Sequence, residues 1–124
     1  MQNPRNLKVT NEAMALAVLT YRVTTAFPAS ERFGLSSQMR RAAVSVGSNI
    51  AEGCGRSGNA ARLSFLHIAL GSATELEFQL ALALRLGLGR PADFPALSSQ
   101  SSRVKGMLTR LIVALRRRPN TPAD

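Results

Sequence analysis

The stretch from Glu31 to Arg56 places the strongest constraint on the fold, because its apolar residues repeat with the period of a helix. Four of them, spaced three or four residues apart, define one face: Met39, Ala43, Val46 and Ile50. They predict a helix over about residues 37–53 that needs a partner to cover this face. Gly47 lies in mid-helix, where glycine costs about 1 kcal/mol relative to alanine, so a close backbone approach or a bend is expected there.

A second line along the same helix is polar and carries mostly short side chains: Gln38, Arg41, Ser45, Ser48, Asn49 and Glu52. One interpretation is a solvated face. Serine and asparagine solubilise a surface less well than lysine and glutamate, however. Hydrogen-bonded contact with another helix or another subunit is therefore the second interpretation, and it makes Ser45, Ser48 and Asn49 the predicted subunit-interface residues.

Apolar residues recur at helical spacing in three further segments and predict helices over about residues 11–27, 59–86 and 94–117. Residues suited to cap the helix starts are Thr10 or Asn11, Ser36 or Ser37, Ser57 or Asn59, and Asp93. Four helices with short connections predict an all-α, up-down-up-down four-helix bundle, with a single domain over residues 1–118 and a disordered tail over residues 119–124. The first helix has apolar residues on two sides, more than one bundle buries, so a partner outside the bundle is expected.

The segment from Gly53 to Gly58 matches the GxGxxG fingerprint of dinucleotide-binding proteins. That site requires a strand before the glycines and a helix after them. Here a predicted helix comes first, and no strand pattern occurs in the sequence. The glycines therefore predict the end of one helix and a turn into the next.

Arginine dominates the charge of the chain. The formal net charge is +9, and Lys8 and Lys105 are the only lysines. A guanidinium group offers a planar fork of donors that suits carboxylate and phosphate. A basic excess of this size points to an anionic partner, with nucleic acid first and a membrane surface second. The alternative is a charged, soluble surface in a protein that uses arginine in place of lysine.

Groups that could act together in catalysis are scarce in the sequence. His67 is the only histidine, and Cys54, the only cysteine, has no further histidine to activate it and no partner for an intramolecular disulfide. Zinc-ligand spacings and a Walker loop are absent. No run reaches the roughly 18 apolar residues that span a bilayer. We therefore expect a cytoplasmic protein that is not an enzyme and has no cofactor, no metal and no membrane association.

Three segments carry a resemblance to a known family: FPASERFGLSSQMRRAAVSVGSNIAEGCGR at Phe27–Arg56, FLHIALGSATELEFQL at Phe65–Leu80, and the pattern at Val104–Leu111. They resemble the four-helix-bundle family first found in open reading frames within intervening sequences of large-subunit ribosomal RNA. That family is similar in fold and assembly to the accessory protein of diversity-generating retroelements, a basic barrel that helps a reverse transcriptase handle RNA. The resemblance implies an up-down bundle in a ring-shaped homopentamer whose biochemical role is undetermined.

Five charged residues match the motif of that family: Arg40, Arg41, Glu52, Glu75 and Glu77. In one interpretation they form structural salt bridges, Arg40 or Arg41 with Glu75, and Arg56 with Glu52 or Glu77. In the other, Arg56, Arg62 and the amino end of the helix over residues 59–86 form an anion pocket for phosphate.

The resemblance and the uncovered helix faces together predict a homo-oligomer, most simply a pentamer. The resemblance further implies RNA, a reverse transcriptase or another RNA-handling protein as the partner. We therefore predict a non-enzymatic, basic, oligomeric scaffold with these candidate phosphate contacts: Arg103, Arg110, Arg116, Arg117, Arg118, Arg56 and Arg62. The alternative is a protein-interaction adaptor that binds no nucleic acid and uses its arginines for solubility and inter-helix salt bridges.

Overall fold

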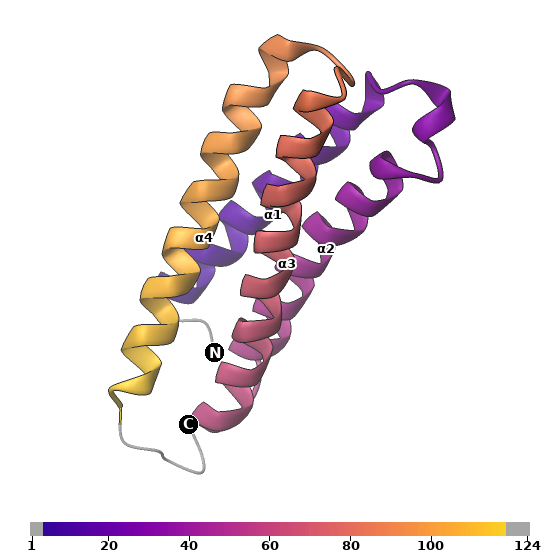
Figure 1. Cartoon of the computed structure of the whole chain (residues 1–124). Coiled ribbons are helices and arrows are strands. Elements are labelled where there is room, and N and C mark those ends of the chain that lie inside the picture. Colours follow the sequence, from indigo (N-terminus) through magenta and orange to yellow (C-terminus); the bar gives the residue numbers. More distant parts are fainter. Residues whose placement is uncertain (1–3, 119–124) are drawn as a thin grey trace.

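The computed structural model describes residues 4–118 as four long helices joined by short connections (Figure 1). They are α1 (Pro4–Thr25), α2 (Leu35–Cys54), α3 (Asn59–Arg85) and α4 (Phe94–Arg116), with 3-10 turns η1 (Ala29–Glu31) and η2 (Pro91–Asp93) before α2 and α4. Helices that follow one another in sequence run in opposite directions and pack side by side, and α4 also packs against α1. The predicted all-α, up-down four-helix bundle is confirmed. The predicted disordered tail lies outside the described residues.

The start of α1 was predicted incorrectly. The helix begins at Pro4 rather than near residue 11, so Thr10 lies inside it and donates its hydroxyl to the carbonyl of Asn6 at 2.8 Å. Proline is well suited to a first helical position, because its fixed φ is helical and its missing N–H would have no partner there. Val9 is 1% exposed and continues the buried stripe of Ala13 and Leu16 by one more turn. That burial explains why the first turns are helical.

The core runs along the whole bundle and consists mainly of leucine, valine and alanine. All four residues of the predicted face of α2 (Met39, Ala43, Val46 and Ile50) are fully buried. The largest buried side chains contributed by the other helices are Leu16, Leu66, Leu76, Leu97 and Leu108. Alanines such as Ala69, Ala73 and Ala83 on α3 let the helix axes come close together.

Asp93 occupies the N-cap of α4 as predicted, whereas the starts of α2 and α3 are held differently from the prediction. The N-cap residues of α2, α3 and α4 are Gly34, Gly58 and Asp93, and none makes a side-chain capping bond. At α2 the carboxylate of Glu31, which lies before the helix, caps the first turn: its Oε1 accepts a hydrogen bond from the N–H of Leu35 at 2.9 Å. Serines at the start of a helix are therefore not needed here.

The glycine-rich segment turns the chain from α2 into α3, as predicted. Gly58 has a φ of 86° and directly precedes α3. Gly53 lies where the two helices meet: a Cβ on it would be 3.1 Å from Phe65 Cβ and 3.2 Å from the carbonyl oxygen of Arg62. The close approach expected at Gly47 occurs at Gly53 instead.

Gly47 and Gly53 give opposite predictions for alanine substitution. A Cβ on Gly47 would meet only Ala13 Cβ at 3.8 Å, an ordinary contact. Gly47→Ala is therefore expected to raise the free energy of unfolding by about 0.5–1 kcal/mol, through helix propensity. Gly53→Ala makes the same gain in helix propensity, but the new methyl group would crowd Phe65 and the carbonyl of Arg62 at a cost of about 1–3 kcal/mol. Its free energy of unfolding is therefore expected to fall. Urea unfolding of both variants checks this, and a destabilised Gly47→Ala protein would contradict it.

Candidate nucleic-acid interface

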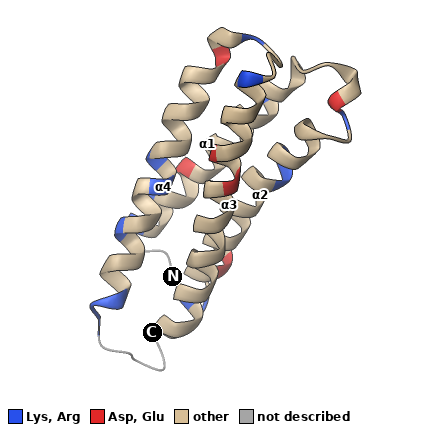
Figure 2. Ribbon diagram, viewed as in Figure 1, with Lys and Arg blue, Asp and Glu red and all other residues tan. Residues whose placement is uncertain are grey.

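The up-down topology brings four basic helix termini to one end of the bundle (Figure 2). We call this the basic end and define it as residues 4–10, 48–56, 59–66 and 109–118. Its cationic residues are Arg5, Lys8, Arg56, Arg62, Arg110, Arg116, Arg117 and Arg118. Glu52 is the single acidic residue within those ranges. The chain therefore concentrates half of its positive residues at one end, which creates a strongly positive local potential.

A groove of about 630 Å³ runs between α1 and α4 at this end, and we call it the α1–α4 groove. Five cationic residues line it: Arg5, Lys8, Arg103, Arg110 and Arg117. Its apolar floor includes Val9, Met107 and Leu111, and no acidic side chain is among its lining residues. Basic side chains along a groove with a low-dielectric floor are suited to hold an extended polyanion.

Arg103 is partly neutralised, because its Nε lies 3.0 Å from Oε1 of Glu12 on α1. The amide of Gln100 also donates to Glu12 Oε1, at 2.9 Å. The hydrogen bond from Gln100, followed by the charge and hydrogen bond of Arg103, holds the pKa of Glu12 below its usual range. The other four cationic residues of the groove form no ion pair with any residue of 4–118.

A second cleft, of about 700 Å³, opens where the ends of all four helices meet. Arg5, Arg62 and Arg118 line it together with Cys54. Arg62 donates through Nε to the carbonyl of Arg56 at 2.8 Å, which fixes its guanidinium at the turn before α3. Burial raises the pKa of the Cys54 thiol, although the nearby charge of Arg62 acts in the opposite direction. Cys54 is therefore a neutral thiol at pH 7.

The predicted phosphate contacts fall into two groups. Arg110, Arg117 and Arg118 are exposed or partly exposed and form no ion pair with a residue of 4–118. Four others already contact a side chain or carbonyl of the same chain: Arg56, Arg62, Arg103 and Arg116. Arg116 pairs with His67 at 2.9 Å, where the imidazole Nε2 is the acceptor. Two further cationic residues, Arg5 and Lys8, were missed, because the segment before residue 11 was not predicted as helix.

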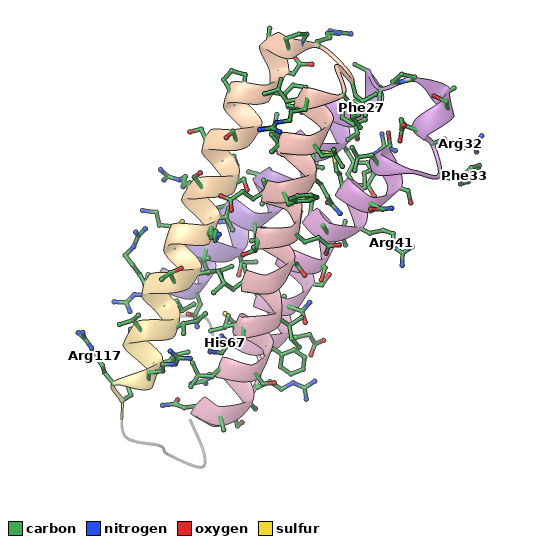
Figure 3. The ribbon with its side chains drawn as sticks, viewed as in Figure 1. Phe27, Arg32, Phe33, Arg41, His67 and Arg117 are labelled. Atoms are coloured by element: carbon green, nitrogen blue, oxygen red, sulfur yellow. The ribbon has the colours of Figure 1, made fainter. Side chains whose placement is uncertain are left out.

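The predicted pairing of Arg40 or Arg41 with Glu75 is wrong. Arg40 faces α1 instead, donates through Nε to Thr24 Oγ1 at 2.8 Å and lies over the Tyr21 ring at 4.7 Å. Arg41, one residue and about 100° further around the helix, points outward (Figure 3) and has no ion pair with a described residue. Glu75 accepts only a hydrogen bond from Gln79 at 3.3 Å among the described contacts.

Of the two salt bridges predicted for Arg56, the structure contains the one with Glu52. Arg56 Nη2 lies 2.9 Å from Glu52 Oε2, one of the two partners proposed for it. The Arg56 guanidinium also lies over the Phe65 ring at 4.9 Å. Glu77 pairs with Lys105 Nζ at 3.0 Å and not with Arg56. Glu77 cannot reach the basic end because it lies in the second half of α3, several turns from Arg56.

Arg40→Ala and Arg41→Ala form a matched pair on adjacent residues. Arg40→Ala is expected to lower the free energy of unfolding by about 1–1.5 kcal/mol, because it removes a charged hydrogen bond and a partly exposed cation–π contact. Arg41→Ala is expected to change it by less than about 0.5 kcal/mol, as for other exposed residues without a contact. Chemical denaturation checks both, and equal losses would show that Arg41 has a structural contact after all.

In the polar line of α2, one residue bonds to another helix of the bundle. The hydroxyls of Ser45 and Ser72 are 2.8 Å apart and join α2 to α3. Asn49 donates to the carbonyl of Ser45 at 2.9 Å, so both residues are engaged within the chain. Ser48 is the exposed member of the three predicted interface residues.

Residues 4–118 contain no cluster of three or more His, Cys, Asp or Glu side chains arranged to hold a metal ion. Within the same residues, no helix combines the length and apolar character needed to cross a membrane. The basic end, with its two clefts, is thus the strongest candidate site in the part of the chain that the structure describes.

Comparison with known proteins adds a family and a fold. The family model described as 23S rRNA-intervening sequence protein matches residues 5–110. The fold is similar to a crystal structure of a protein of unknown function from the S23 ribosomal protein family of Bacteroides thetaiotaomicron, with a TM-score of 0.80 and 24% identity over 88% of this chain and 98% of that one. No curated protein matches the chain.

Proposed function

The chain belongs to the 23S rRNA-intervening sequence protein family, and on that basis we propose that it is a non-enzymatic, oligomeric scaffold that binds structured RNA. The observation that carries the proposal is the α1–α4 groove, with Arg5, Lys8, Arg110 and Arg117 along its sides. These side chains form no ion pair with residues 4–118, so they are available to a phosphate backbone without first breaking an internal salt bridge.

The chemistry of the basic end favours backbone recognition over base recognition. Phe65 is the only aromatic residue in the ranges that define it, and the guanidinium of Arg56 already covers its ring. Sequence-specific reading of single-stranded RNA relies on aromatic side chains that stack on splayed bases. Arginine and lysine without such platforms suit duplex or hairpin RNA, which proteins recognise by shape and phosphate contacts.

We further propose that the scaffold is a ring-shaped homo-oligomer, with a pentamer as the simplest form. Several large apolar side chains remain exposed in the single chain: Leu7, Met14, Val18 and Tyr21 on α1, Val44 on α2, and Ile68, Phe78 and Leu82 on α3. The residues of α1 and those of α3 lie on helices that do not pack directly on each other, so they form separate exposed apolar surfaces, and such surfaces mark interaction sites. A ring would give each bundle two neighbours and would place several basic ends together, which strengthens polyanion binding through multivalency.

A salt series with the purified protein tests the RNA proposal. Hairpin RNA is expected to bind at low ionic strength, with an affinity that falls steeply and linearly on a logarithmic plot as salt is added. Absence of binding at low salt would remove the nucleic-acid function. Light scattering on the same sample tests assembly, because a lone chain has a mass of 13.3 kDa.

A protein-interaction adaptor is the second candidate. It is favoured by the internal contacts of Arg56, Arg103 and Arg116, which show that part of the positive charge already serves structure. Its partner would present an acidic surface, and an RNA-handling protein such as a reverse transcriptase is one such candidate. A partner that stays bound through nuclease treatment would favour this function over direct RNA binding.

A further inference from the structure

Phe33 is the most exposed large apolar side chain of the described chain, at 86% of its full accessibility. It lies between η1 and α2 and points away from the bundle (Figure 3). The guanidinium of Arg32 lies 5.1 Å from the centre of its ring, which leaves an aromatic and a cationic group displayed together. Fully exposing a phenylalanine is unfavourable, so a contact outside the chain would be expected to cover it.

The backbone that carries Phe33 is held in place from both sides. The N–H of Arg32 donates to the carbonyl of Ala29 at 3.1 Å, and that of Gly34 to Glu31 at 3.0 Å. The Glu31 carboxylate then accepts the N–H of Leu35 at 2.9 Å. A side chain on so well bonded a segment is preorganised, and it loses little conformational entropy when it docks.

The bundle has a pocket of about 420 Å³ between the second half of α3 and the start of α4, which we call the α3–α4 pocket. Leu80, Ala81, Leu84 and Phe94 contribute apolar walls, and Glu77 is also among its lining residues. The hydroxyl of Ser101 lines it too, is buried and has no hydrogen-bond partner among residues 4–118. An aromatic ring suits this site, because its face is a weak acceptor for a hydroxyl that has nothing else to bond.

We propose that Phe33 of one copy docks into the α3–α4 pocket of a second copy of this chain. Charge complementarity supports a second copy as the occupant. Docking would bring Arg32 towards Glu77, whose side chain is 52% exposed and whose Oε1 is paired with Lys105 Nζ at 3.0 Å, so Arg32 would share this carboxylate with Lys105. The inference rests on the oligomeric scaffold proposed above and names its interface.

The positions of the two elements determine the kind of assembly. Both lie at the end of the bundle opposite the basic end, Phe33 on the α1–α2 side and the pocket on the α3–α4 side. Each copy therefore gives one contact and receives another, a heterologous arrangement that closes into a ring when the rotation allows. Neighbouring bundles would lie side by side, with every basic end on the same face.

Three variants test the interface by light scattering at micromolar concentration. Phe33→Ala removes the inserted ring, and Ala81→Trp fills the pocket from an exposed position. Each variant alone is expected to have the mass of one 13.3 kDa chain, with an unchanged helical circular dichroism spectrum. Leu86→Ala is the control, because Leu86 is 58% exposed at the end of α3 but does not line the pocket, and it should keep the wild-type mass.

Mixing the two monomeric variants gives the sharpest result. Phe33→Ala copies keep an open pocket and Ala81→Trp copies keep Phe33, so an equal mixture is expected to form a complex of two chains and no larger species. A Phe33→Ala protein that retains the wild-type mass would overturn this interface while leaving the ring in place. A wild-type protein of one chain would overturn both this interface and the proposed assembly, whereas RNA binding is judged separately by the salt series.

Discussion

Replacing Arg110 and Arg117 together with glutamine is expected to weaken hairpin-RNA binding by about tenfold or more at low salt and to reduce the slope of log affinity against log salt by about 1–2. Both residues line the α1–α4 groove, and neither has an ion pair with residues 4–118. With fewer phosphate contacts, binding displaces fewer counterions from the RNA, so the affinity and its salt dependence should fall together. Fluorescence anisotropy with a labelled hairpin measures both quantities.

The control for this variant is a double substitution of Arg22 and Arg85 by glutamine. It makes the same change in formal charge, from +9 to +7 since 9 − 2 = 7, but at the end of the bundle opposite the groove. Its RNA affinity should fall by less than about threefold, through the long-range field alone. Equal losses in the two variants would show that net charge, and not the groove, carries the binding.

The fold was largely predictable because helical periodicity reports burial directly. Met39, Val46 and Ile50 were assigned to the core from spacing, and all three are fully buried. The start of α1 was missed because residues 4–9 are mostly polar or basic, and among these described residues only Val9 is buried. A short, mostly polar segment with a single buried apolar residue has too weak a helical periodicity to be distinguished from an irregular N-terminal segment.

The candidate site was less predictable, since it depends on the angular position of single side chains. Arg40 and Arg41 are neighbours in sequence, yet one contacts α1 and the other faces outward. Arg5 and Lys8 were not placed beside Arg110 because that proximity requires the early start of α1, whereas the antiparallel packing of α1 on α4 already follows from the predicted bundle. The clustering of Arg116, Arg117 and Arg118 was visible, because it is local.

Gly89→Ala is expected to lower the free energy of unfolding by about 2–5 kcal/mol, because it combines an unfavourable backbone conformation with a steric clash. Gly89 has a φ of 70°, where a side chain costs about 1–2 kcal/mol. A Cβ there would also lie 2.8 Å from Cε1 of Phe27. That ring cannot easily move, since it stacks on Phe94 with ring centres 6.4 Å apart and so joins the end of α1 to the start of α4.

Gly87→Ala is the matched control, because it separates backbone strain from the steric clash. Gly87 has a φ of 72° and ends α3 in a Schellman motif, but a Cβ on it would have no neighbour within 4 Å. It should therefore cost only about 1–2 kcal/mol in urea unfolding at the same protein concentration. In a Phe27→Leu background the smaller side chain leaves room for the new methyl group, so Gly89→Ala should become less costly by about 1–2 kcal/mol. Equal costs for Gly87→Ala and Gly89→Ala, with no coupling to Phe27, would mean that the contact between this turn and the Phe27–Phe94 stack contributes nothing to stability.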